Sequence, residues 1–168
     1  MFSVMSFTIQ VPCKSYSKHF LELKYGDPVI LVRDKLLYRQ LVLSLEKNSN
    51  RYRKKYESLA FSNYSEVVNI TIKRNDFYRL GWDLTRTEIV EFNQALEMKA
   101  KSFMHAFIAP RIAVGFNWTE TIGLFQDQFG FTEDVWSFEA IRKECQRNLT
   151  IDRGELFREL LTNINNIV

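Results

Sequence analysis

Two short stretches of the chain alternate apolar and polar residues in the way that a strand with one face on a core does. The clearer stretch covers residues 66–73, where β-branched residues occupy every second position on one face. The other covers residues 7–11 and is expected to end at Pro12. We expect these two strands to pair in a small sheet.

Helical spacing of apolar residues fills part of the chain between the two strands. Residues 15–25 follow this spacing and then meet the sequence Gly-Asp-Pro at 26–28, which stops a helix. Asp34 is a suitable N-cap for a second helix over residues 36–47. That helix is apolar enough to be buried on more than one side, so we expect it at the centre of the core.

The chain after the second strand is predicted to be helical. Asn75 or Asp76 can cap a single turn that Gly81 ends. Thr85 and Glu88 then form a capping box, in which each side chain accepts a hydrogen bond from an otherwise unpaired backbone amide, and a long helix follows. The inner stripe of the long helix is Ile89, Phe92, Leu96, Phe103 and Phe107.

Pro110 is expected to kink or end the long helix, because it lacks an amide hydrogen and crowds the preceding turn, and Gly115 offers a second stop. Two short helices that meet at Gly130 are expected within residues 117–148, followed by a tail helix over residues 152–167. The apolar positions of the pair are Ile122, Leu124, Phe125 and Phe129 in the first helix, and Trp136, Phe138 and Ile141 around the second.

These elements predict an α+β fold, a mainly helical domain with a small β-sheet and a C-terminal hairpin like a helix-turn-helix. The chain of 168 residues is long enough for one domain with its own core. We predict a single domain over residues 1–168, with a mixed β/α part over 1–75 and a helical part over 76–168. The outline of the hairpin is shared by DNA-reading domains and by many plain helical hairpins.

The composition is that of an ordinary globular protein. Hydrophobic residues make up 46% and charged residues 26%, so disorder is not expected to dominate. The longest apolar runs fall far short of the roughly 20 residues that cross a bilayer, and the first residues lack the features of a secretory signal. The expected location is therefore the cytoplasm, with no membrane partner. Cys13 and Cys145 lack metal-ligand spacing and are expected to be reduced, packed thiols.

Basic residues concentrate in the first part of the chain. Residues 1–75 hold 13 Lys and Arg against 6 Asp and Glu, whereas residues 76–168 hold 10 against 14. The densest run, KNSNRYRKKY at 47–56, is expected to be an exposed loop or helix end. Its cations can bind phosphates and its tyrosines can stack on bases, although a solvated charge run is the alternative. The predicted nucleic-acid contacts in this run are Arg51, Tyr52, Arg53, Lys54 and Lys55.

The hairpin supplies a second set of cations, Arg142, Lys143 and Arg147, on the outward side of its second helix. In a major groove these side chains would meet phosphates or guanine edges. Residues 119–168 nevertheless hold five basic and nine acidic side chains, and DNA affinity depends largely on neutralising phosphates. The alternative is a hairpin that serves packing alone, because a groove contact requires its cations to be segregated from its carboxylates.

No pattern in the sequence indicates catalysis. His19 and His105 have no carboxylate or cysteine at the spacing of a relay or a metal site. The adjacent carboxylates Glu133 and Asp134 suit the start of a helix, where they interact favourably with its dipole. No glycine-rich phosphate loop is present. We therefore predict a protein without enzymatic activity, catalytic residues, metal or cofactor.

Three segments carry a resemblance to a known group of proteins: YGDPV at 25–29, DFYRLGWDLT at 76–85 and FQDQFGFTEDVWSFEAIRKE at 125–144. Together they look like short, uncharacterised proteins encoded by bacteriophages and mobile elements of gut bacteria, and the likeness covers nearly the whole chain. That group carries no activity or site residue that transfers to this chain. As a class, small phage and mobile-element proteins resemble DNA-binding regulators, replication accessories or virion components.

The leading expectation is a nucleic-acid-binding accessory or regulatory protein of a phage or mobile element, which acts in the cytoplasm of a bacterial host. The alternative is a non-enzymatic structural or adaptor protein, such as a virion component, that uses aromatic surface to bind itself or another protein. Trp118, Phe131 and Trp136 lie near the expected turn and are the first candidates for such an anchor, although core packing is the more favoured role for them.

Overall fold

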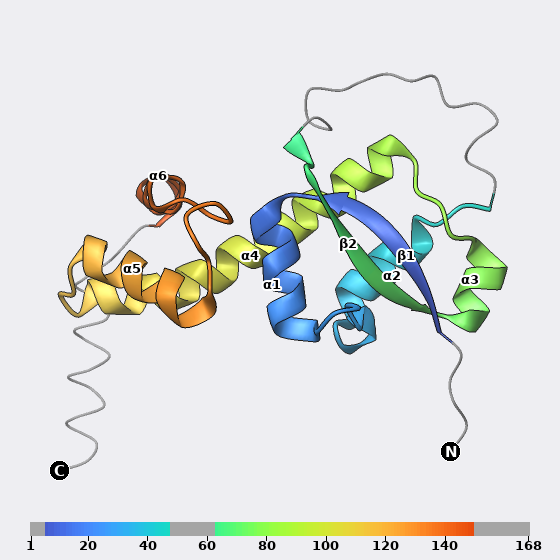
Figure 1. Ribbon diagram of the computed structural model, residues 1–168, viewed down its shortest axis with the longest axis horizontal. Helices are drawn as coiled ribbons and strands as arrows, with labels where there is room; N and C mark the ends of the chain where they lie inside the picture. The colour runs from blue at the N-terminus through green and yellow to red at the C-terminus, as the bar shows by residue number, and fades with distance from the viewer. Residues whose placement is uncertain (1–5, 48–62, 150–168) are drawn as a thin grey trace, which may run out of the picture. The chain divides into compact units, whose positions relative to one another are not determined.

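The structure is a computed structural model that describes residues 6–47 and 63–149 (Figure 1). Within these ranges it is an α+β protein with six α-helices and a two-stranded antiparallel sheet, which confirms the main terms of the predicted fold class. The chain divides into two compact units, Met1–Ala100 and Lys101–Val168. The single domain predicted over residues 1–168 stays a prediction.

The sheet of the N-terminal unit consists of β1 (Ser6–Cys13) and β2 (Glu66–Lys73). The strands pair antiparallel, as predicted, with Phe7 opposite Ile72 and Val11 opposite Val68. Val29 adds a short parallel bridge to β2, because its amide donates to the Asn69 carbonyl at 2.8 Å and its carbonyl accepts from the Thr71 amide at 2.9 Å. In the part of the chain that the structure describes, β1 is therefore the outer strand.

Pro12 does not end β1, contrary to the prediction. The strand continues to Cys13, and Pro12 lies opposite Val67. The prediction failed because proline is tolerated in an edge strand where its nitrogen points away from the partner. The carbonyl of Pro12 points the same way and accepts a hydrogen bond from Asn93 Nδ2 at 2.7 Å. The proline thus gives the strand an anchor on the long helix instead of a stop.

The core of the N-terminal unit lies against one face of the sheet (Figure 1). It is closed by α1 (Ser15–Tyr25), a 3₁₀ turn η1 (Leu31–Arg33), α2 (Lys35–Leu43) and the first part of α4 (Arg86–Ala113). Helix α1 has the predicted bounds. The buried side chains alternate along the strands and follow helical spacing elsewhere; they include Ile9, Val11, Phe20, Leu21, Leu37, Leu41, Val68, Ile70, Ile72, Phe92 and Leu96.

Helix α2 is shorter than predicted and is buried on one side only. Asp34 caps it as expected, because the Leu37 amide donates to Asp34 Oδ1 at 3.1 Å. The helix ends at Leu43 because Glu46 instead pairs with Asp83 in an antiparallel bridge. Leu36 and Leu43 are 77% and 68% exposed, so the expectation of burial on more than one side is wrong.

Helix α3 (Arg74–Leu80) follows β2 directly. Its N-cap is Lys73 and no side chain caps it, so the capping roles predicted for Asn75 and Asp76 are wrong. The carboxylate of Asp76 accepts a hydrogen bond from the Tyr38 hydroxyl at 2.7 Å instead. Gly81 ends the helix as predicted, with a φ of 116° that favours glycine.

Helix α4 begins at the predicted capping box. The Thr85 amide donates to Glu88 Oε2 at 2.7 Å, and the Glu88 amide donates to Thr85 Oγ1 at 3.2 Å. The helix does not end at Pro110 but continues to Ala113. Pro110 removes only one amide, and it lies at an exposed position, where water can satisfy the unpaired carbonyl. Gly115 follows with a φ of 99° and lies at the predicted stop.

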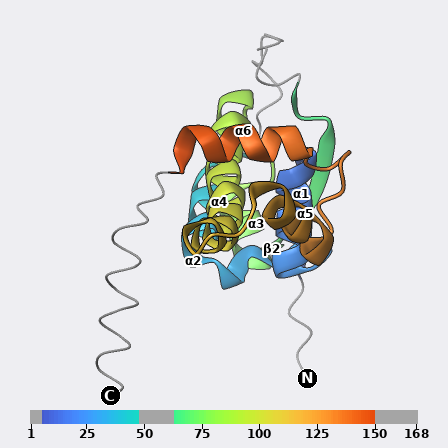
Figure 2. The same ribbon diagram turned by 90° about the vertical axis from the view of Figure 1, so that its left-hand side faces the viewer.

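The C-terminal unit contains the last part of α4, α5 (Trp118–Phe129) and α6 (Phe138–Asn148). Helix α5 runs across the view of Figure 1 while α6 is seen end-on, and Figure 2 shows the reverse, so the two axes cross steeply. Phe125 is the centre of an aromatic core. Its ring centroid lies 5.7 Å from that of Phe107, 5.4 Å from Phe129 and 5.0 Å from Phe131.

Most of the apolar positions predicted for the helix pair are inside. Ile122, Phe125 and Ile141 are buried, but Leu124 is 47% exposed because it lies outside the buried stripe of α5, which includes Thr121, Ile122 and Phe125. Phe131 and Trp136 are buried, so core packing is their role. The tail helix predicted over 152–167 lies outside the described residues. Across residues 6–47 and 63–149, no helix combines the length and the apolar character that a membrane crossing requires.

Candidate nucleic-acid interface

The predicted contacts of the basic run lie outside the described residues: Arg51, Tyr52, Arg53, Lys54 and Lys55. The first described range ends at Lys47, directly after the residue that forms a backbone bridge, Glu46. The amides of Trp82 and Asp83 each donate to the Glu46 carbonyl at 3.1 Å, and the Glu46 amide donates to the Asp83 carbonyl at 2.9 Å. The basic run therefore follows, along the chain, a segment that is fixed to the residues after α3.

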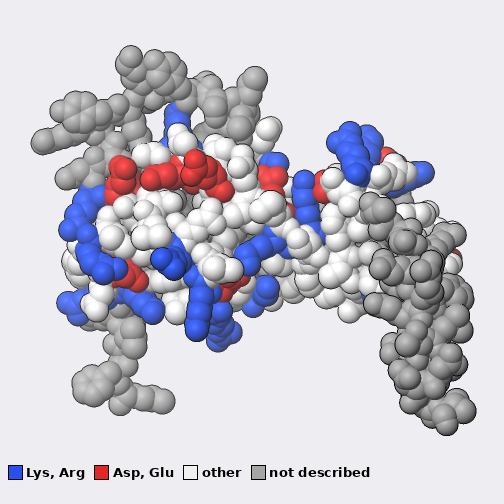
Figure 3. Space-filling model, turned by 180° about the vertical axis from the view of Figure 1, so that it is seen from behind, with Lys and Arg blue, Asp and Glu red and all other residues white. Residues whose placement is uncertain are grey.

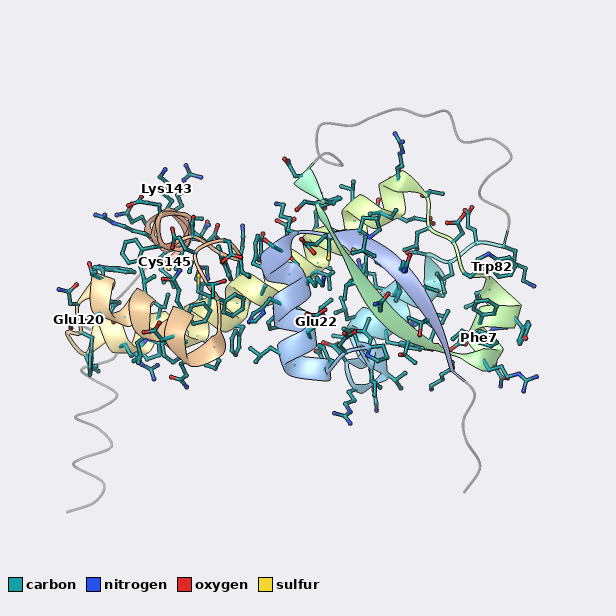
Figure 4. All side chains as sticks on the ribbon, in the orientation of Figure 1. Phe7, Glu22, Trp82, Glu120, Lys143 and Cys145 are labelled. Carbon is teal, nitrogen blue, oxygen red and sulfur yellow. The ribbon has the colours of Figure 1, made fainter. Side chains whose placement is uncertain are left out.

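The second predicted set of cations lies on α6, whose start is held by two side chains. Ser137 Oγ accepts from the Ala140 amide at 3.3 Å, and Glu133 Oε2 accepts from the Phe138 amide at 2.9 Å. Ile141 and Cys145, one turn apart, are fully buried. This anchoring leaves the opposite side of α6 in solvent, and Figure 4 shows Lys143 and Cys145 on opposite sides of the helix.

The carboxylate in the middle of α6 is turned away from the outward cations. Glu144 Oε2 lies 2.9 Å from Lys101 Nζ on α4, and its Oε1 accepts from Asn148 Nδ2 at 2.7 Å. Burial opposes the ionisation of Glu144, but hydrogen bonds from Lys101 and Asn148 outweigh it and hold the pKa of this carboxyl below its usual range. Glu144 is thus ionised at neutral pH and engaged inside the unit.

The structure brings Arg142, Lys143 and Arg147 together on the exposed side of α6, as predicted. Arg142 Nη1 lies 3.7 Å from Glu139 Oε1 in an exposed pair that contributes little. Within residues 6–47 and 63–149, no carboxylate lies within ion-pair distance of Lys143 or Arg147. These two cations are separated by one helical turn, so they form one small basic surface.

The other helix of the pair carries no comparable surface. Its exposed charges include Glu120 and Asp127, and Figure 4 shows Glu120 on α5, away from Lys143. Eight residues, from Gly130 to Ser137, join α5 and α6. A helix-turn-helix has a turn of about 3–4 residues. The cations of the described helix pair are therefore presented by α6, after a longer connection than the motif uses.

A second basic surface, around α3, was not predicted from the sequence. Lys73, Arg74 and Arg79 are exposed there, beside the exposed rings of Tyr78 and Trp82. In Figure 3, Lys and Arg side chains gather along the edge of the N-terminal unit that carries α3. The segment IKRNDFYRLGW mixes cations with aromatic residues as the basic run does, so the signal was present. It was missed because the segment was assigned only a capped helical turn.

In residues 6–47 and 63–149, no three His, Cys, Asp or Glu side chains are grouped so that they could hold a metal ion. Cys13 and Cys145 are free and buried, and burial raises the pKa of each thiol to about 12. Both are packed, protonated thiols at neutral pH, as predicted.

Comparison with protein-family models, with curated proteins and with solved structures finds no match to this chain.

Proposed function

We propose that this protein binds nucleic acid through exposed cations and acts as an accessory or regulatory protein of a phage or mobile element in the cytoplasm of its bacterial host. The observation that supports this proposal best is the segregation of charge on α6. Lys143 and Arg147 are exposed, whereas Glu144 between them is held by Lys101 at 2.9 Å.

This segregation matters because the C-terminal unit as a whole has more acidic than basic residues. Residues 101–168 hold seven basic and nine acidic side chains, so their average field does not attract DNA. Affinity nevertheless depends on where the cations lie, and α6 presents Arg142, Lys143 and Arg147 on one side. We propose that α6 makes backbone contacts with phosphates, and that the helix pair acts as a variant of a helix-turn-helix with a longer connection.

The basic run of the N-terminal unit adds to the proposed function. Arg51, Arg53, Lys54 and Lys55 are proposed to bind phosphates, and Tyr52 to stack on a base or donate a hydrogen bond. This run begins directly after Glu46, which pairs with Asp83. Measurable affinity for nucleic acid at low salt requires several separate phosphate contacts.

The test is fluorescence anisotropy with labelled duplex DNA, single-stranded DNA and RNA over a range of salt concentrations. Replacement of two α6 cations, Lys143→Gln with Arg147→Gln, removes two phosphate contacts. We expect weaker binding to every sequence and a slope of log affinity against log salt that is smaller by about 2.

Two matched variants serve as controls. Glu139→Gln removes the partner of Arg142 without removing a cation, so it should strengthen binding. Lys24→Gln with Arg33→Gln removes two exposed charges elsewhere and should leave the salt slope near the wild-type value. Absence of binding to all three nucleic acids in low salt would refute the proposed function.

A structural or adaptor role is the second candidate, and exposed apolar residues favour it. Val114 and Phe116 of the C-terminal unit are 51% and 57% exposed. Large exposed aromatic side chains are common interface anchors. Light scattering at increasing concentration tests this candidate, because Phe116→Ser should shift a self-associating protein toward the monomer. A wild-type protein that stays monomeric and captures no partner would exclude it.

A further inference from the structure

Four aromatic side chains gather where β1 meets α3, and we refer to them as the aromatic cluster: Phe7, Phe77, Tyr78 and Trp82. Phe77 stacks on Phe7 with 4.2 Å between ring centroids and on Trp82 with 5.2 Å. Tyr78 meets both Phe7 and Phe77 edge-on, with 5.5 Å between centroids in each pair. Figure 4 shows Phe7 and Trp82 beside α3.

The aromatic cluster is open to solvent. Tyr78 is 55% exposed and Trp82 is 48% exposed, although both rings contact their neighbours. Trp82 is also held at its backbone, because its amide donates to the Glu46 carbonyl at 3.1 Å. Rings held in this way lose little freedom when a flat ligand stacks on them, so the surface is organised before binding.

One cation contacts the aromatic cluster, and two more are exposed on the same segment of the chain, residues 73–79. The Arg74 guanidinium lies 5.8 Å from the centroid of the Tyr78 ring, and Arg79 has a side chain that is 73% exposed. Lys73 is exposed at the end of β2, with its ammonium 5.7 Å from the centroid of the Tyr38 ring. Positive groups and flat rings therefore occur together on one described surface.

Two nearby carboxylates have partners within the protein. Asp76 accepts from the Tyr38 hydroxyl at 2.7 Å, and its contact with Arg79 is longer, at 3.5 Å. Asp83 Oδ1 accepts from the Leu84 amide at 3.0 Å. Glu46 is also exposed near Trp82. Hydrogen bonds from a hydroxyl or an amide do not remove the charges of Asp76 and Asp83, so all three carboxylates oppose an anion there.

We propose that the aromatic cluster and the cations of residues 73–79 bind a single-stranded nucleic acid. Unpaired bases stack on Trp82 and Tyr78, while Lys73, Arg74 and Arg79 contact the phosphates. The ligand is a single strand because the faces of bases within a duplex are covered by their neighbours and cannot reach a protein ring. This inference depends on the proposed nucleic-acid function and assigns a substrate class and a second set of residues to it.

The probe is a fluorescein-labelled oligo-dT of about 15 nucleotides, compared with a duplex of the same length, at low and at moderate salt. We expect Trp82→Ala and Tyr78→Ala each to weaken oligo-dT binding by about tenfold with an unchanged salt slope, because each removes a stacking contact and no charge. Arg79→Gln should instead reduce the slope by about 1. Duplex binding should change little in the aromatic variants.

Two measurements separate lost stacking from lost folding. Tyr78→Phe keeps the ring and should bind oligo-dT like the wild type, and thermal melts should show that every variant is folded. Oligo-dT should also quench tryptophan emission in the wild type. Trp82→Phe keeps a ring for stacking but removes the reporter, so it should bind the strand with less quenching.

The outcomes also separate this inference from the proposed function. Binding of the duplex without binding of oligo-dT would overturn the single-strand site and leave the function of α6 intact. Equal oligo-dT affinity in the wild type and in folded Trp82→Ala and Tyr78→Ala would overturn it as well. Failure of the wild type to bind the duplex, oligo-dT or RNA at low salt would overturn both proposals.

Discussion

The ammonium of Lys99 lies 2.6 Å from Oδ2 of Asp34, so a residue of α4 is joined to the carboxylate that caps α2. The same oxygen accepts a hydrogen bond from the Tyr25 hydroxyl, at the end of α1, at 3.0 Å. The Asp34 side chain is only 12% exposed. One carboxylate therefore connects three helices of the N-terminal unit.

The stability of this unit should depend on the ionisation of Asp34. Burial opposes its charge, but hydrogen bonds from Lys99, the Leu37 amide and Tyr25 outweigh burial and lower its pKa to about 2. A lowered pKa gives stability that is present above the unfolded value near 4 and is lost as the pH falls toward 2. The loss should be about 2 kcal/mol, measured by urea unfolding between pH 5 and pH 2.

Asp34→Asn is the matched variant, because it retains a side chain that can cap α2 but cannot ionise. It should be less stable than the wild type at neutral pH and should lose less stability on acidification. An unchanged acid dependence in this variant would show that other carboxyls govern the transition.

Gly81 should tolerate no side chain, since its backbone approaches the chain before the basic run. A Cβ at Gly81 would overlap the backbone carbonyl group of Glu46 and the amide nitrogen of Lys47. Gly81→Ala combines that overlap with strain at a φ of 116°, and we expect it to cost several kcal/mol, roughly 2–5. Thermal unfolding measures the effect.

Gly26→Ala is the control for Gly81→Ala. Gly26 resembles Gly81 in its backbone, because both have a positive φ and an extended ψ. A Cβ added at Gly26 would meet no atom within 4 Å. This variant should cost only the backbone strain, about 1–3 kcal/mol. Equal destabilisation by the two substitutions would mean that the close approach to Glu46 is unimportant.

The capping box at the start of α4 should have a measurable effect on stability. Thr85→Ala removes the oxygen that accepts from the Glu88 amide at 3.2 Å and should cost about 1 kcal/mol. Thr85→Ser keeps the hydroxyl and should be close to the wild type. Thr87→Ala, at an exposed position of the same turn, should also have little effect. Denaturant unfolding of the three variants gives the comparison.

His105 should make the C-terminal unit sensitive to mild acid. Burial lowers its pKa and outweighs the attraction of Glu144, whose Oε1 lies 4.0 Å from His105 Nε2. The unfolded chain therefore takes up a proton at higher pH than the native protein, and stability falls as the pH drops below about 6.5. His105→Gln should make the melting temperature less dependent on pH between pH 7 and pH 5.

His19→Gln is the control in the N-terminal unit. It replaces the other histidine of the chain, so it tests whether histidine loss by itself changes the acid dependence. The acid sensitivity would not be due to His105 if the melting temperature of His105→Gln fell with pH as steeply as that of the wild type. The same would follow if the melting temperature of His19→Gln did not change with pH.

Local patterns were enough to predict much of the fold. The alternation of residues 66–73 predicted β2, the spacing of residues 15–25 predicted α1, and Thr85 with Glu88 predicted the start of α4. Each signal depends on neighbours within a few positions, as capping and periodicity do. The outward position of Arg142, Lys143 and Arg147 followed from the same periodicity.

The remaining features were decided by contacts between distant parts of the chain. Pro12 stays within β1 because its strand is an edge that Asn93 anchors, and α2 stops early because Glu46 pairs with Asp83. The stacking of Phe7 on Phe77 joins residues that are 70 positions apart. The sequence by itself therefore determined which segments are helical or extended and which faces are apolar. Only the tertiary structure decided where those segments end and which aromatic rings meet, because such contacts depend on packing between segments that no local pattern encodes.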